Sequence, residues 1–165
     1  MKEDEVYVGT KAWFNAKGFL ALAGQPPNGC DNIPTIEIKD ASNLDKGSKG
    51  SFKPDLLFGN SKYLIIVECK PLDDKKDEIK LLEVLTNNHR KKLLFEEISQ
   101  RGIFQRRKLE KYFTDFQQFS SKLKACLSHG GKPRLMEKIM TLSLSSISGL
   151  GDLTQPLNND YKIDF

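Results

Sequence analysis

Residues 51–72 read SFKPDLLFGNSKYLIIVECKPL and hold two apolar runs separated by a Gly-Asn pair. The second run, 64–67, consists of Leu, Ile and Val, which is typical of a strand buried on both faces. The short connection GNSK at 59–62 predicts a hairpin between two antiparallel strands. The stretch therefore predicts the centre of a sheet, but its first strand begins at Asp55 and its second ends with Glu68 and Lys70.

These three charged residues are expected at one edge of the sheet. Glu68 and Lys70 point to the same face because side chains alternate along a strand. In a hairpin that turns near Gly59, the start of the first strand lies beside the end of the second, so Asp55 approaches Glu68. Two neighbouring carboxylates repel each other unless a cation lies between them, and Mg²⁺ prefers such oxygen ligands. With a lysine that can orient or deprotonate a water, the pattern predicts a site for phosphodiester hydrolysis.

Composition indicates one globular domain over residues 1–165. Charged residues make up 29% and apolar residues 38% of the chain, which are ordinary values for a folded protein. Its cysteines, Cys30, Cys69 and Cys126, form no CxxC pair, which disfavours a disulfide framework or a zinc site. The sequence has an acidic start and no apolar run of about 18 residues. We therefore expect a soluble cytoplasmic protein with no membrane partner.

Hydrophobic periodicity predicts an α/β fold with a central mixed sheet of about four strands flanked by helices. Helices are expected at 3–22 (with a break at Gly18), at 73–100 and at 103–128. Strands are expected at 35–40, 51–58, 64–70 and 138–146, the first three as an antiparallel meander. Residues 41–50 are expected to form a turn, and 147–165 a C-terminal loop with a short strand at 161–165. In the second helix the spacing favours a buried face with Ile79, Leu82 and Leu85.

The sequence KPD at 53–55 and LIIVECK at 64–70 resemble the motif of the PD-(D/E)xK nuclease superfamily, which has the restriction-endonuclease-like fold. The resemblance implies a sheet of about four strands between helices, in the order helix, three strands, helix, strand. It covers about residues 3–146, although only Pro54, Asp55, Glu68 and Lys70 match the motif itself. The second long helix expected at 103–128 departs from the common pattern and puts the subfamily in doubt.

The resemblance also implies roles for the residues of the motif. Asp55 and Glu68 would bind Mg²⁺ or Mn²⁺, the backbone carbonyl of Cys69 would be a third ligand, and Lys70 would be the catalytic lysine. Alternation along the strand points the Cys69 side chain into the core on the opposite face. Members of the superfamily often add a glutamate from the first helix.

Three further acids are candidates for an additional ligand. Glu5 or Glu3 could supply the glutamate of the first helix, or could be ordinary acidic residues at a helix N-terminus. Asp40, at the end of the TIEIKD segment, is another candidate. The sequence alone does not choose among them.

Positive charge is concentrated in the second half of the chain. Residues 89–134 carry 12 Lys/Arg against 4 Asp/Glu, a balance of +8, whereas residues 1–72 carry 9 of each. Such a segment could contact a polyanion, or it could be the solvated surface of helices. The candidates for contacts with nucleic-acid phosphates are Arg90, Lys91, Lys92, Arg106, Arg107, Lys108 and Lys111.

Several functions are compatible with these patterns. The leading expectation is a Mg²⁺-dependent endonuclease acting on nucleic acid, with DNA favoured over RNA by family frequency, in a restriction or defence system. An RNA endonuclease of the cap-snatching type is an alternative, although both histidines, His89 and His129, follow Lys70. Another alternative is a non-catalytic module that binds nucleic acid or protein. The plainest interpretation is that Glu68 and Lys70 form only a surface ion pair. A homodimer, or a place within a larger nuclease, also stays open.

Overall fold

The computed structural model describes residues 1–39 and 51–165. Within them the chain forms a six-stranded mixed sheet whose strands follow one another in chain order. The strands are β1 (Leu20–Gly24), β2 (Leu56–Gly59), β3 (Leu64–Lys70), β4 (Leu123–His129), β5 (Met140–Leu144) and β6 (Gly151–Thr154). β1, β2 and β3 are antiparallel, β3, β4 and β5 are parallel, and β6 is antiparallel to β5. The α/β class and the mixed sheet are confirmed, but the expected number of about four strands is wrong.

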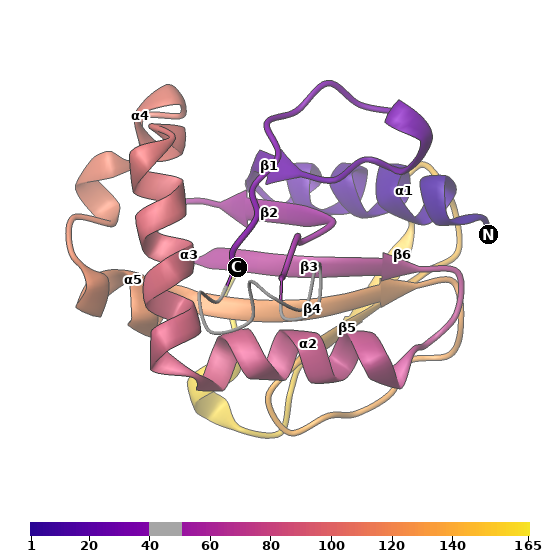
Figure 1. Ribbon diagram of the computed structural model, residues 1–165. Coiled ribbons are helices and arrows are strands. Elements are labelled where there is room, and N and C mark those ends of the chain that lie inside the picture. The colour runs from indigo at the N-terminus through magenta and orange to yellow at the C-terminus, as the bar shows by residue number, and fades with distance from the viewer. Residues whose placement is uncertain (40–50) are drawn as a thin grey trace.

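Helices cover both faces of this sheet (Figure 1). One face is covered by α1 (Glu3–Ala16), and the other by α2 (Lys75–Thr86) and α3 (Asn88–Gln100). Short helices follow: α4 (Ile103–Arg106) and α5 (Phe116–Lys122), with 3₁₀ turns η1 (Pro27–Gly29), η3 (Glu110–Tyr112) and η4 (Asn159–Tyr161). Figure 1 shows the N-termini of α1 and α2 beside the carboxyl end of β3, and α3, α4 and α5 towards its amino end.

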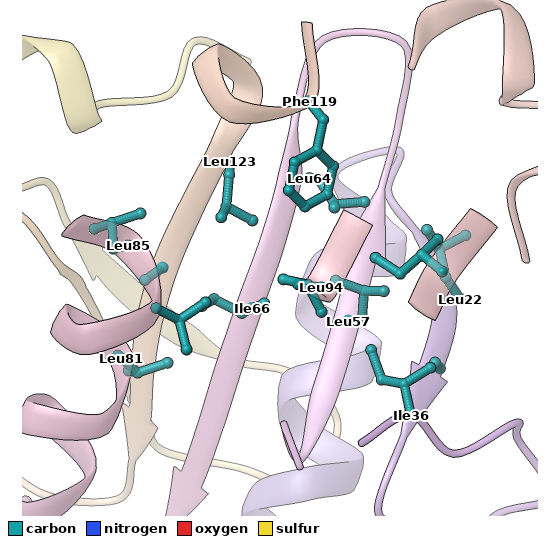
Figure 2. Close-up of a cluster of buried hydrophobic side chains, with 14 of the residues drawn as sticks. Leu22, Ile36, Leu57, Leu64, Ile66, Leu81, Leu85, Leu94, Phe119 and Leu123 are labelled. Carbon is teal, nitrogen blue, oxygen red and sulfur yellow. The ribbon is translucent and has the colours of Figure 1, made fainter. Parts of the chain in front are cut away.

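Alternation along β3 divides the core into two layers. Leu64 and Ile66 belong to the cluster on the α2 side of the sheet, which also holds Leu81 and Leu85 of α2; Figure 2 shows Leu64 beside Phe119. Ile65, Val67 and Cys69 pack on the α1 side with residues such as Phe14. Because the period of a strand is two, Glu68 and Lys70 continue the α2 side and Cys69 the α1 side. The expected burial of the Cys69 side chain on the opposite face is confirmed.

The first strand of the meander is β1 and not the segment 35–40. α1 ends at Ala16, and Gly18 at a φ of +87° turns the chain into β1, so the expected break at Gly18 is confirmed. The segment 35–40 contributes one isolated bridge, Ile38 to Phe52. The sequence of β1, LALAG, contains good helix formers, and its strand conformation comes from pairing with β2. Asp40 and the expected turn at 41–50 lie outside the described residues.

The predicted hairpin between β2 and β3 is confirmed. Gly59 pairs with Leu64 and Leu56 with Val67 in an antiparallel register. Asn60 closes the turn, since its backbone N–H donates to the Tyr63 carbonyl at 3.0 Å. Its side-chain oxygen also accepts from the backbone N–H of Tyr63 at 2.8 Å.

The expected helix at 73–100 is two helices that meet at Asn87. Asp74 caps α2 by accepting from the Lys76 N–H at 2.9 Å, and Asn87 caps α3. The predicted apolar face of α2 is shifted. Its buried residues include Leu81 and Val84, whereas Ile79 is 50% exposed.

The expected helix at 103–128 is wrong. The segment forms α4, η3, α5 and β4, and Lys108 at a φ of +57° interrupts it after α4. Its apolar residues are core as expected, because Phe113 and Phe119 are buried, but they come from separate elements. β4 is a central buried strand that carries Lys124 and His129. These polar residues interrupt the continuous apolar run that is typical of a buried parallel strand, so the sequence does not show that pattern.

The end of the chain agrees with the prediction in part. The late strand expected at 138–146 is confirmed as β5. β6 was not predicted, and it lies within the expected C-terminal loop. The short strand expected at 161–165 is wrong, since the chain there leaves η4 as an irregular segment.

Candidate active site

The register of the β2–β3 hairpin places the two predicted acids opposite each other. Leu56 pairs with Val67, so one step further along the antiparallel register sets Asp55 against Glu68. Both side chains lie on the α2 side of the sheet, and the two residues are 9% and 3% exposed. The local sequence of the hairpin thus brings two carboxylates together in a largely dry environment.

Asp55 is held by the neighbouring strand. Its Oδ2 accepts a hydrogen bond from the Cys69 backbone N–H at 2.7 Å. Burial raises the pKa of the Asp55 carboxyl to about 6, against the opposing effects of that hydrogen bond and of Lys70. The negative charges of Glu3 and Asp77 raise this pKa further.

Glu68 is the more strongly perturbed acid. Burial raises the pKa of Glu68 to about 9, and the charges of Asp55 and Asp77 add to that effect. Lys80 and Lys70 act in the opposite direction. Its Oε1 is buried and has no hydrogen-bond partner among the described residues. A carboxylate oxygen that is buried without a partner is costly, and a bound cation would satisfy it.

Lys70, the last residue of β3, contacts the first helix. Its Nζ donates to Glu3 Oε1 at 3.0 Å. Burial lowers the pKa of Lys70, but the hydrogen bond to Glu3 and the charge of Asp55 outweigh burial, so the pKa is raised overall. Of the two candidates in the first helix, Glu3 therefore reaches the motif. Glu5 instead accepts from the Lys2 backbone N–H at 2.8 Å, at the start of α1.

Asp77 is an acid of this site that sequence reasoning missed. It lies in the first turn of α2, with its side chain 2% exposed. Its Oδ1 accepts from Lys80 Nζ at 3.2 Å, while its Oδ2 has no partner among the described residues. The acidic run at the start of α2 was the available signal. Of the expected face, Leu82 and Leu85 do pack on the core, but Ile79 is exposed, and Asp77, Leu81 and Val84 are buried beside Leu85 instead.

His129 is a second residue that the sequence did not place correctly. Its position beside two glycines suggested a helix end, but it is the buried last residue of β4. It pairs with Lys70 in the parallel register. Its Nδ1 accepts from the Gly131 N–H at 3.0 Å, and its Nε2 has no partner within the described residues. His89, in contrast, lies exposed at the start of α3.

The donor set suits Mg²⁺ better than a transition metal. Over residues 1–39 and 51–165, no group of three or more His, Cys, Asp or Glu side chains is arranged to hold a metal ion. Mg²⁺ needs only one or two carboxylates because it retains waters, and Asp55 and Glu68 supply two. The thiol of Cys69 lies on the other face, 3.7 Å from Thr10 Oγ1. A ligand role for Cys69 through its backbone carbonyl stays a prediction.

A polar cleft gives access to Asp55. It has a volume of about 530 Å³, in the range of small-molecule and cofactor sites. Glu3 and Lys2 of the α1 N-terminus line one part of it, and Gln25 and Asn28 of the segment after β1 line another. A substrate that enters here meets Asp55 and the Glu3 side chain that holds Lys70.

The predicted basic residues lie at the other end of the sheet. Lys91 Nζ donates to Ser120 Oγ, three residues before the start of β4, and Arg107 Nη2 donates to the Ala21 carbonyl of β1. Both contacts are level with the amino end of β3, which at seven residues spans about 20 Å. In the sequence, Arg90 and Lys92 flank Lys91, and Arg106, Lys108 and Lys111 lie close to Arg107. The structure therefore does not bring this basic segment next to the carboxylates.

Comparison with known proteins gives no relative for this chain. No protein-family model, curated protein or solved structure matches it. Within the part of the chain that the structure describes, no helix is long and apolar enough to cross a membrane. The function has to be inferred from the chemistry of the site.

Proposed function

We propose that the protein is a metal-dependent endonuclease that hydrolyses phosphodiester bonds, with Asp55 and Glu68 as ligands of Mg²⁺ or Mn²⁺ and Lys70 as the catalytic lysine. One observation carries the proposal. Two buried carboxylates with raised pKa values lie opposite each other at the carboxyl end of β3, next to a lysine. Acids whose charged forms are disfavoured in this way are typical of sites completed by a cation or a substrate.

The order of the elements supports membership of the PD-(D/E)xK superfamily. α1, the antiparallel strands β1 to β3, α2 and the parallel strand β4 follow the order that the resemblance implies. Asp55 stands at the start of the second strand and Glu68 in the third, as in the motif. The replacement of the segment 35–40 by β1 leaves this order unchanged.

The residues of the site divide the chemistry between them. Asp55 and Glu68 would hold a divalent cation, which would neutralise their charges and polarise the phosphodiester. Lys70 has a raised pKa and is therefore a cation at neutral pH, so it stabilises charge that builds on the phosphate and does not serve as a base. Glu3 positions its ammonium group. The charge of Asp77 strengthens the negative potential that attracts the cation.

DNA is the substrate that we propose, on family frequency alone, with a restriction or defence system as its setting. The proposal is tested by incubating the protein with plasmid, single-stranded DNA and RNA, each with Mg²⁺, Mn²⁺ or EDTA. We expect cleavage with either metal and none with EDTA. Asp55→Asn and Glu68→Gln should each reduce cleavage by at least about 100-fold, a typical effect of removing a group that stabilises the transition state.

The matched control is Asp152→Asn, an exposed carboxylate on β6 at the other side of the sheet. This variant should cleave like the unaltered protein. Cleavage that survives EDTA, or that both site variants retain, would show that the two acids are not the catalytic ligands.

A further inference from the structure

A second polar pocket lies at the amino ends of β3 and β4, away from the candidate active site. Its volume is about 330 Å³. It is bounded by the start of α3, by the junction between α5 and β4, and by η4 near the end of the chain. Leu85 and Leu123 close its apolar side, and its polar wall consists of Lys91, Ser120, Ser121, Lys124, Asp160 and Tyr161.

Two lysines lie in this pocket, and among the residues that the structure describes neither donates a hydrogen bond to a carboxylate. Lys124, although on a central strand, is only 7% exposed, and its Nζ donates to the backbone carbonyls of Asp160 at 2.5 Å and Ser121 at 3.3 Å. Lys91 is partly buried, and its Nζ donates to Ser120 Oγ at 3.2 Å. Carbonyl and hydroxyl oxygens thus hold the ammonium groups, and because these acceptors are uncharged they do not neutralise the positive charges.

The two positive charges also oppose each other. Burial lowers the pKa of Lys91. Burial likewise lowers the pKa of Lys124; the charge of Asp160 opposes this, and the charge of Lys91 adds a smaller lowering effect. Because the pKa of Lys124 is lowered overall despite Asp160, burial disfavours both ammonium groups, and an anion between them would relieve that desolvation.

We propose that this pocket binds a phosphate group, held between the ammonium groups of Lys91 and Lys124 with the Ser120 hydroxyl as a further donor. Because Ser120 Oγ accepts from Lys91, its own proton is free to be donated to an anion. Two cations and a hydroxyl that approach from different elements suit an anion with several oxygens and more than one charge, and lysine is a common phosphate ligand. The proposal does not depend on the endonuclease function.

The phosphate could belong to free phosphate or to a nucleic-acid backbone. The pocket lies about 20 Å from the carboxylates, the length of β3 and β4, and a DNA strand rises 3.4 Å per nucleotide. A duplex of about six base pairs would therefore be needed to reach from one site to the other. The two sources share the same chemistry at Lys91 and Lys124, and an experiment with both distinguishes them.

The test is an NMR titration that follows backbone amides of the full chain with inorganic phosphate and, separately, with a 12-base-pair duplex that lacks terminal phosphates, in EDTA. We expect saturable shifts at Ser120, Ser121, Lys124 and Tyr161. Lys91→Gln and Lys124→Met should each weaken binding by at least about tenfold, the loss expected for one charge-assisted hydrogen bond. Shifts with phosphate identify a small-molecule site, and shifts with the duplex alone identify a backbone contact.

Lys92→Gln is the matched control, since it removes the same charge from the exposed neighbour of Lys91. It should bind like the unaltered protein. The amide spectrum itself reports folding, and the partly exposed Lys91→Gln keeps the test decisive if Lys124→Met does not fold. The proposal is overturned if neither ligand gives saturable shifts in the pocket, or if Lys91→Gln and Lys92→Gln bind equally well.

Discussion

Glu68 links the chemistry of the candidate site to the stability of the protein. Its pKa is about 9 in the folded protein, against 4.5 as the ordinary value. Below pH 4.5 the carboxyl is protonated in both folded and unfolded states. Between pH 4.5 and about 9 the carboxyl ionises in the unfolded chain but stays protonated in the folded protein. Ionisation therefore favours the unfolded state, and the free energy of unfolding falls as the pH rises through this range. At neutral pH the metal-free protein therefore carries a local destabilisation at its own site.

This linkage predicts the effect of Glu68→Gln on stability. In EDTA the free energy of unfolding of the unaltered protein should fall between about pH 5 and pH 9, and the variant should show a flatter profile. At pH 9 the variant should be more stable by up to about 6 kcal/mol, the product of the rise from 4.5 to about 9 and 1.36 kcal/mol per pKa unit. Urea unfolding at a series of pH values measures this difference.

Glu110→Gln, at an exposed position in η3, is the control and should follow the unaltered protein. A large loss of stability in Glu68→Gln across the whole pH range would mean that this acid is structural, and the catalytic assignment would then be wrong.

Lys70 and Glu3 are expected to contribute unequally to cleavage. Lys70→Met removes the ammonium group of the motif, and it should lower kcat by about 100-fold or more. Glu3→Gln keeps a hydrogen-bond acceptor for Lys70 and should cost no more than about tenfold. Glu5→Gln, two residues further on in the same first turn of α1, should have no effect. Equal losses in Glu3→Gln and Glu5→Gln would contradict a positioning role for Glu3, and single-turnover rates decide the matter.

The residues of the motif could be placed from the sequence because local rules determine them. Alternation along β3 and the tight connection to β2 are enough to set Asp55 opposite Glu68 with Lys70 beyond it. Asp77 and Glu3 reach the site through the packing of α2 and α1 on the two faces of the sheet. No short-range pattern specifies that packing, and so Asp77 was missed and Glu3 was not distinguished from Glu5.

At the scale of elements, the register of α2 on the sheet decides which of its acids faces the site. The structure buries Leu81 and exposes Ile79, which the sequence had assigned to the apolar face. Leu81→Ala should destabilise the protein by about 2–5 kcal/mol because it leaves a cavity against Ile66. Ile79→Ala should change stability by no more than about 0.5 kcal/mol. Thermal unfolding of the two variants tests the helix phase, and the reverse order of effects would show that Asp77 points away from the site.

The elements that sequence reasoning missed are those in which tertiary context opposes local preference. β1 contains Leu and Ala and reads as a continuation of α1, yet it pairs with β2. β4 holds the polar residues Lys124, Ser128 and His129, and contacts from other elements accommodate them, as in the bond between Ser128 and Thr10 of α1 at 2.7 Å. In contrast, β2, β3 and β5 have apolar patterns that agree with their burial, and they were predicted.

At the scale of the whole molecule, the two candidate metal-binding acids and the basic residues predicted to contact phosphates lie at opposite ends of β3. The carboxyl end holds Asp55 and Glu68, and the amino end lies level with Lys91 and Arg107. Figure 1 shows α3, α4 and α5, which carry or adjoin most of the basic residues, gathered at that end. A nucleic acid that contacts both regions has to extend about 20 Å, the length of β3.

The number of phosphates that the basic residues contact predicts how binding of DNA depends on salt. With the cleavage-deficient Glu68→Gln protein, three to five phosphate contacts would give a slope of log K against log salt of roughly −3 to −4.5 on duplex DNA. Substitution of both Arg106 and Arg107 by Gln should flatten the slope by up to about 2, with little dependence on DNA sequence. Fluorescence anisotropy over a range of salt concentrations measures it. An unchanged slope would assign Arg106 and Arg107 to solvated surface.

The central claim is that Asp55 and Glu68 together form a divalent cation site, and calorimetric titration of the metal-free protein with Mn²⁺ at pH 8 tests it most directly. The account predicts saturable binding of one ion, accompanied by proton release from Glu68, whose pKa of about 9 keeps it largely protonated at pH 8, whereas Asp55 with a pKa of about 6 is already ionised. Glu68→Gln and Asp55→Asn should each abolish that binding, and Asp152→Asn should retain it. Absence of saturable binding in the unaltered protein, or equal binding in Glu68→Gln, would contradict the account.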